Sequence, residues 1–122
     1  MRRKNSTVQC KFHPMLTAFL FKADEYYSNL GSEVTITSGS ETITRHGYTS
    51  LHYATPCQAA DVRSWTVIYG EVSYTAKMQH KELIQLAIDF CTTENIPADW
   101  VEVILESDHH HIEYQPKRQE GV

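Results

Sequence analysis

The stretch Val101-Glu-Val-Ile-Leu-Glu-Ser-Asp-His-His-His-Ile-Glu-Tyr-Gln115 holds two strand-like runs, 101–105 and 109–115, joined by three residues. Two such runs with a short connection predict a β-hairpin. Because side chains alternate across a strand, every second residue of the later run should share a face. One face would then hold His109, His111 and Glu113, and the other would hold His110, Ile112 and Tyr114.

Two amphipathic helices are predicted upstream of this hairpin. The first covers residues 14–30, where apolar residues recur at the spacing of one helical face. These residues are Leu16, Phe19, Leu20, Ala23, Tyr26, Tyr27 and Leu30. Pro14 suits the first helical turn and Gly31 suits the position just after the helix. The second helix runs from about Lys77 to Glu94 and is ended by Pro97.

Between the helices, the alternating run Val34-Thr-Ile-Thr-Ser38 predicts a strand. Residues 40–58 carry no sustained period and are expected to form a long irregular loop. A further strand is predicted at Ala59-Ala-Asp-Val-Arg63, whereas Trp65–Tyr69 fits either an extension of it or a connection. This order of elements predicts an α+β fold, with a small, mostly antiparallel sheet packed with two main helices.

Length and composition bound the class of protein. The 122 residues, 41% of them hydrophobic, predict one domain over 1–122, with flexible ends at about 1–8 and 116–122. The formal net charge of −4 gives no support to nucleic-acid binding. Three widely spaced cysteines argue against a disulfide scaffold. Without a long apolar run or a signal-peptide pattern, we expect a cytoplasmic protein with no membrane partner. The chain is also expected to be a monomer.

The histidine-rich run also predicts a metal site. A catalytic zinc needs three nitrogen or oxygen ligands and one open position for water. His111 can supply one nitrogen, and His52 and Asp61 are the upstream candidates. Zinc held in this way lowers the pKa of bound water and polarises a carbonyl group. Asp108, three residues before His111, is placed to act as the general base.

Four separated segments carry a family resemblance: Ile36-Thr-Ser-Gly39, Ser50-x-His52, Ala59-x-Asp61-x-Arg63 and Asp108-x-x-His111. In this order they resemble the M15-type zinc peptidases, which comprise D-alanyl-D-alanine carboxypeptidases and dipeptidases and phage L-alanyl-D-glutamate endolysins. The resemblance implies a Hedgehog/DD-peptidase-like fold. It also implies that His52, Asp61 and His111 bind Zn²⁺, that Asp108 is the catalytic base and that His109 stabilises the oxyanion.

The same resemblance implies hydrolysis of peptide bonds in peptidoglycan stem peptides by an endolysin-like protein, released to the cell wall during phage lysis. Which bond is cut stays open between L-alanyl-D-glutamate, D-alanyl-D-alanine and an interpeptide bridge. The family arginine that binds the substrate carboxylate is missing at its usual place. Arg45 is the candidate for that role, with Arg63 as the alternative, and Ser50 is a second substrate-binding candidate.

Two departures from the family pattern leave alternatives open. The interval from His52 to Asp61 is nine residues where the family has seven, and Cys57 stands at the family's glycine position. These departures motivate a second hypothesis, a non-catalytic zinc-binding or virion-structural module with the same fold. Cys57 itself offers two more: a nucleophile assisted by a histidine, or a replacement zinc ligand.

Overall fold

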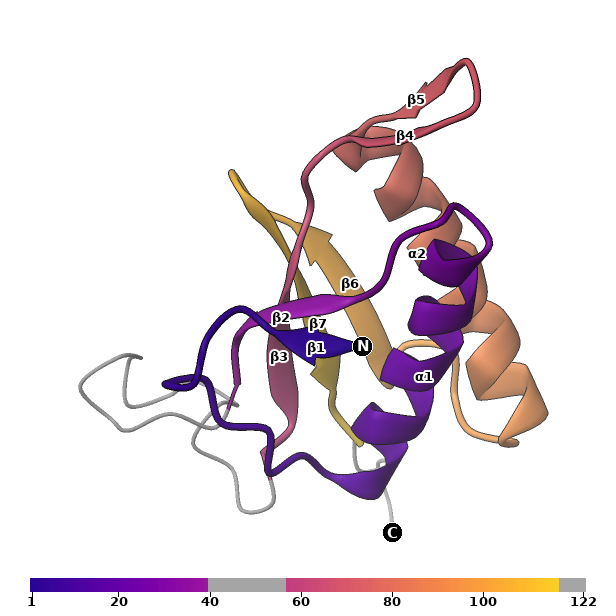
Figure 1. The fold of residues 1–122 in the computed structure, drawn as a ribbon. Helices are drawn as coiled ribbons and strands as arrows, with labels where there is room; N and C mark the ends of the chain where they lie inside the picture. Colours follow the sequence, from indigo (N-terminus) through magenta and orange to yellow (C-terminus); the bar gives the residue numbers. More distant parts are fainter. Residues whose placement is uncertain (40–56, 117–122) are drawn as a thin grey trace, which may run out of the picture.

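The computed structural model describes residues 1–39 and 57–116 (Figure 1). Along the chain its elements are β1 (Arg2–Arg3), α1 (Pro14–Ser28), β2 (Thr35–Ser38), β3 (Ala59–Arg63), β4 (Val67–Tyr69), β5 (Val72–Tyr74), α2 (Ala76–Thr93), β6 (Val101–Leu105) and β7 (His109–Tyr114). Most of the predicted loop, 40–58, lies outside the described residues.

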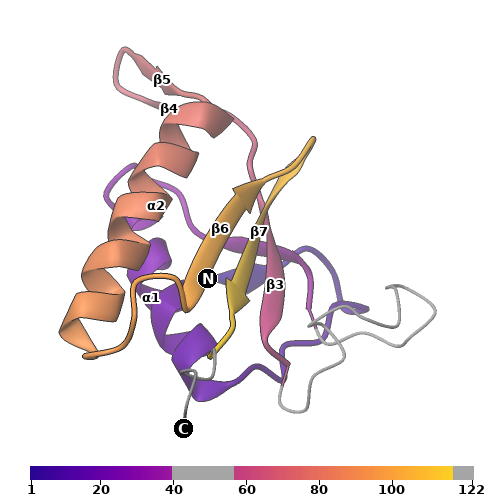
Figure 2. The same cartoon turned by 180° about the vertical axis from the view of Figure 1, so that it is seen from behind.

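A five-stranded sheet with strand order β1-β2-β3-β7-β6 forms the centre of the molecule. Its pairs are antiparallel except β1 with β2, which run parallel. Both helices lie on one side of this sheet, and no helix of the described residues covers the opposite side, called the open face below (Figures 1 and 2). The predicted α+β class, with two helices and a mostly antiparallel sheet, is therefore confirmed. Neither helix among the described residues has the length and apolar character needed to span a membrane.

The predicted apolar faces of the helices form the core against the sheet. Fully or almost fully buried residues are Leu16, Phe19, Leu20, Ala23 and Tyr27 of α1 and Leu83, Ala87, Phe90 and Cys91 of α2. His13 precedes α1 and caps it, because its Nδ1 accepts a hydrogen bond from the Met15 amide at 3.1 Å. Asn95, with φ of 57°, takes the left-handed conformation that ends α2.

The predicted hairpin is present as β6 and β7, and its face alternation is confirmed. Ile112 and Tyr114 join the core under the helices, and His110 is fully buried beside them. His109, His111 and Glu113 are only partly buried and lie on the open face. The strand β3 pairs with the other edge of β7, so residues 59–63 and 109–113 lie side by side.

Two parts of the fold differ from the expectations. Trp65–Tyr69, whose fate the pattern left open, contributes β4 of a separate hairpin, β4–β5. Gly70, with φ of 63°, takes the first loop position, where type II′ turns favour glycine. The first eight residues, predicted as a flexible end, contribute strand β1, and the amides of Arg2 and Lys4 donate to the carbonyl oxygens of Val34 and Ile36, each at 2.8 Å. Val8 of the same segment is buried in the core.

Close packing explains why residue 39, at the end of the Ile36-Thr-Ser-Gly39 segment, is a glycine. A Cβ atom at Gly39 would collide with the carbonyl oxygen of Gln9 and touch the ring of Phe12. Only glycine allows the chain before α1 to pass this close to the end of β2. Gly39 therefore has a packing role, since it lets the chain before α1 lie against the end of β2.

Candidate functional site

Polar side chains gather on the open face of the sheet, where β3 and β7 run side by side. In the register of this pair, Asp61 lies opposite His111 and Arg63 lies opposite His109. The strand alternation that buries Val62 and His110 points these four side chains away from the helices. Residues 46 and 50 positions apart in sequence are thus brought together by a single strand pairing.

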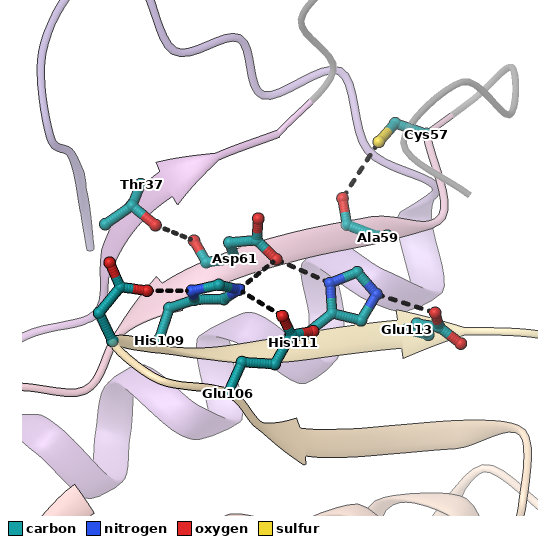
Figure 3. A network of polar contacts seen from close by, with 9 residues as sticks. Thr37, Cys57, Ala59, Asp61, Glu106, His109, His111 and Glu113 are labelled. Carbon is teal, nitrogen blue, oxygen red and sulfur yellow. Dashed lines mark hydrogen bonds and ion pairs between the residues drawn. The ribbon is translucent and has the colours of Figure 1, made fainter. Parts of the chain in front are cut away.

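His111 lies between two carboxylates (Figure 3). Its Nδ1 is 2.7 Å from Oδ1 of Asp61, and its Nε2 is 2.8 Å from Oε1 of Glu113. The side chains of Asp61 and His111 meet on neighbouring strands, and each is 15% exposed. Both ring nitrogens of His111 are therefore committed to carboxylate partners in a half-buried setting.

The environment of His111 favours its protonated form. Burial lowers the pKa of this imidazole, but hydrogen bonds and charge attraction from Asp61 and Glu113 outweigh burial and raise the pKa above its ordinary value. In its protonated form, the imidazolium can donate one N–H to each carboxylate. A cation that replaces the Nδ1 proton would meet the same nitrogen and the same Asp61 oxygen.

His109 forms a second layer around the same aspartate. Its Nδ1 is 2.6 Å from Oδ1 of Asp108, and its Nε2 is 3.6 Å from Oδ1 of Asp61 and 3.4 Å from Oε2 of Glu106. Figure 3 shows the His109 ring pointing toward Asp61, on the same side as His111. Asp108 itself is 79% exposed at the start of β7, and so it approaches the cluster through His109.

The structure brings together some of the predicted site residues, and others are not among the residues it describes. Asp61, His109 and His111 form one cluster, with Asp108 at its rim. His52, Arg45 and Ser50 lie outside the described residues. Arg63 is on the same face, and its guanidinium carbon lies 3.8 Å from the ring centroid of Trp65.

Two carboxylates of the cluster, Glu106 and Glu113, were not assigned a role from the sequence. Strand alternation had placed Glu113 on the same face as His111, two residues away. That shared face was the signal from which its contact with His111 could have been predicted. Cys57, proposed as nucleophile or replacement ligand, is 1% exposed and donates from Sγ to the carbonyl oxygen of Ala59 at 3.1 Å. A buried thiol bonded to backbone is poorly placed for nucleophilic attack.

The donor set suits zinc in kind. Zinc binds imidazole nitrogen and carboxylate oxygen, and a ligating histidine usually donates its other ring N–H to a carboxylate. Asp61, His111 and Glu113 have this arrangement. Within residues 1–39 and 57–116, no group of three or more His, Cys, Asp or Glu side chains is arranged to hold a metal ion. The described residues thus supply two adjacent ligand candidates, and a third donor has to complete them.

The search for relatives finds no matching family model, curated protein or solved structure. The likeness to zinc peptidases is accordingly carried by the four sequence segments alone. The α+β architecture and the Asp61–His111 pair rest on the structure of this chain.

Proposed function

We propose that this protein is a zinc-dependent hydrolase of peptide bonds, of the M15-like kind with a Hedgehog/DD-peptidase-like fold. The observation that carries the proposal is the pairing of Asp61 with His111, two predicted ligands that meet across β3 and β7 at 2.7 Å. Nothing in strand alternation alone requires two residues 50 positions apart to face each other at that distance. The backing of His111 by Glu113 supports the same assignment.

Asp61 and His111 would hold the zinc together with His52, the third ligand of the predicted set. When bound there, zinc would supply Lewis-acid polarisation of the peptide carbonyl and would lower the pKa of a water molecule. Glu113 accepts the Nε2 hydrogen of His111 and so keeps Nδ1 directed at Asp61. The ring of His111 is thereby fixed in the orientation that a ligand needs.

Asp108 and His109 are the groups that would handle protons and charge. Asp108 is exposed to arriving substrate and acts as the base that accepts a proton from water and later returns it to the leaving amine. His109 is held by Asp108 through Nδ1, which leaves its Nε2 directed toward Asp61. From that position it would stabilise the negative charge that develops on the carbonyl oxygen.

The substrate class, a peptidoglycan stem peptide, is taken from the resemblance to wall peptidases. The sheet face around the cluster is compatible with a peptide laid across it, because no helix of residues 1–39 and 57–116 covers that side (Figures 1 and 2). An endolysin-like role, with release to the cell wall during phage lysis, belongs to the same proposal.

The test separates metal binding from chemistry. Asp108→Asn should keep one zinc per chain, and it should lower the release of amines from purified peptidoglycan by about 10²–10⁴-fold, the usual effect of losing a general base. Asp99→Asn, which makes the same change at an exposed position between α2 and β6, is the matched control and should keep wild-type hydrolysis. Full hydrolysis by Asp108→Asn would remove Asp108 from the mechanism.

A non-catalytic zinc-binding or virion-structural module is the second candidate. It is favoured by the nine-residue interval between His52 and Asp61 and by the 79% exposure of Asp108. This module would bind zinc, yet the wild-type protein would release no amines from peptidoglycan or from D-alanyl peptides. A cysteine hydrolase would instead lose activity on thiol alkylation and ignore chelators.

A further inference from the structure

A hollow of about 620 Å³ lies between the β1 edge of the sheet and the β4–β5 hairpin. One wall comes from Arg2 of β1 and from the turn at residues 30–33 that joins α1 to β2, and the other comes from residues 65–68. The volume falls in the range of about 300–1,000 Å³ that is typical of small-molecule sites. Among the described residues that line the hollow, none belongs to the cluster around His111, so the two features are separate.

The two walls are held in place by contacts outside the hollow. The carbonyl oxygen of Trp65 accepts a hydrogen bond at 2.9 Å from the side-chain amide of Gln79, a fully buried residue of α2. The ring of Tyr69 lies against the opposite wall, because a Cβ atom at Gly31 would be 3.7 Å from its Cδ2 atom. The hairpin therefore leans on the turn after α1, and the hollow is formed before any ligand enters it.

Trp65 offers an aromatic face to this hollow. The guanidinium carbon of Arg63 lies 3.8 Å from the ring centroid of Trp65, which fixes the ring from one side. Trp65 is nevertheless 65% exposed, and the neighbouring Ile68 is 72% exposed. Large apolar side chains that stay exposed beside a hollow mark a binding surface. A ligand that covers them needs a flat, apolar face.

The opposite wall supplies hydrogen-bonding groups whose charges are largely matched. Nε of Arg2 lies 3.5 Å from Oε1 of Glu33 and donates to Oγ1 of Thr35 at 3.3 Å. Hydroxyl groups, which can both donate and accept, are added by Ser32 and Thr66. This wall therefore suits a ligand that carries several hydroxyl groups and no net charge.

We propose that this hollow binds a neutral saccharide of one or two pyranose rings. A pyranose ring has a face of C–H groups that can stack on Trp65, and a rim of hydroxyl groups that can bond to Arg2 and Glu33. A nucleotide could also stack on Trp65, but its phosphate would meet the carboxylate of Glu33 in a chain of net charge −4. The inference goes beyond the proposed hydrolase, because this site needs neither zinc nor peptide cleavage.

The indole N–H signals in an NMR spectrum of the whole chain test this proposal. The chain has two tryptophans, so the signal of Trp65 reports on the hollow and that of Trp100 is an internal control. The probes are two β-linked disaccharides, cellobiose and N,N′-diacetylchitobiose. At least one of them should shift the Trp65 signal in a saturable way and leave the Trp100 signal in place. Sorbitol has hydroxyl groups but no ring, and should shift neither signal.

Calorimetric titration of variants locates the binding. Trp65→Ala should weaken binding of the disaccharide about tenfold or more, as expected for the loss of a central aromatic contact. Trp65→Phe keeps a flat ring and should retain more of the affinity. Phe21→Ala is the matched control, because it removes an aromatic side chain of similar exposure, 56%, from α1 outside the hollow. This control should bind as wild type does.

Three results would overturn the saccharide site. They are no saturable shift of the Trp65 signal with either disaccharide, equal shifts of both tryptophan signals, and wild-type affinity in Trp65→Ala. Adenosine monophosphate that binds more tightly than both disaccharides and shifts the same Trp65 signal would overturn the saccharide in favour of a nucleotide. The zinc and amine-release assays decide the proposed hydrolase separately, whatever the hollow binds.

Discussion

A single side chain, His111, joins the two halves of the candidate site. Its Nδ1 faces Asp61 on β3, and its Nε2 faces Glu113 on its own strand. A carboxylate on the far nitrogen fixes the ring orientation and increases the basicity of the near nitrogen. Glu113 should therefore act as a positioning residue for the metal and need not touch it.

Replacing that carboxylate gives the first prediction. Glu113→Gln should lower the affinity for zinc by about 10–100-fold, because the neutral amide orients His111 less strongly and the negative charge of the carboxylate is lost. Competition against a coloured zinc chelator measures this change. Glu82→Gln, the same substitution on the exposed side of α2, should leave the affinity within about twofold. Equal affinities for the two variants would exclude a supporting role for Glu113.

At the residue scale, the sequence predicted which side chains share a face but not which of them touch. Alternation along β7 correctly separated His109 and His111 from His110. The partner of His111 across the sheet depends on the register between β3 and β7, and residues 64–108 separate the two strands. No local pattern encodes that register, so the contact of His111 with Asp61 could not be derived from spacing, whereas strand alternation had already placed Glu113 on the face of His111.

At the scale of elements, a buried polar layer joins α2 to the rest of the fold. The side-chain amide of Gln79 donates to the carbonyl oxygens of Trp65 and Tyr74, each at 2.9 Å. Its oxygen accepts from Tyr27 at 2.7 Å and from Nε2 of His110 at 3.3 Å. Gln79 of α2 thus bonds to both ends of the β4–β5 hairpin. It also accepts a hydrogen bond from the buried, neutral His110.

The buried histidine gives a prediction on acid stability. Burial, with added repulsion from His80 and His109, lowers the pKa of His110 to about 4 from an unfolded value of 6.5. The unfolded state therefore binds this proton first, and stability present above pH 6.5 is lost as pH falls toward 4. The expected slope is about 1.4 kcal/mol per pH unit.

Urea unfolding in chelator, between pH 7 and pH 4.5, measures that slope. His110→Leu removes the titrating group and should show a shallower loss of stability than wild type over this range. Tyr27→Phe removes another partner of Gln79 without a group that titrates here, so it should be less stable yet keep the wild-type slope. Parallel pH profiles for wild type and His110→Leu would contradict the assignment.

Long periodic elements were predictable and short ones were not. Helix 14–30 is observed as Pro14–Ser28, and helix 77–94 as Ala76–Thr93, because their apolar spacing is sustained over many residues. β1 has two residues and β4 and β5 have three each, which is too few for a period to emerge. Gly70 before Glu71 was the one local signal of the β4–β5 turn.

At the scale of the whole molecule, the two faces of the sheet have separate tasks. The helix-covered face buries the apolar core, and the open face carries the ionisable cluster (Figures 1 and 2). Substitutions at the cluster should therefore change metal binding with little loss of core packing. The proposed binding of zinc at this site should raise the free energy of unfolding of the whole protein, since a ligand that binds only the folded state stabilises it.

Thermal unfolding with and without zinc tests this linkage. At a zinc concentration about 100 times the dissociation constant, the wild-type protein should gain about 2.7 kcal/mol in free energy of unfolding, seen as a rise in Tm. The gain should shrink as pH falls, because protons compete for His111, whose pKa is raised. Asp61→Asn, which keeps the shape but not the charge, should abolish the gain. Asp89→Asn, an exposed site on α2, should retain it. An equal zinc-dependent rise in Tm for Asp61→Asn and wild type would place the metal elsewhere on the protein.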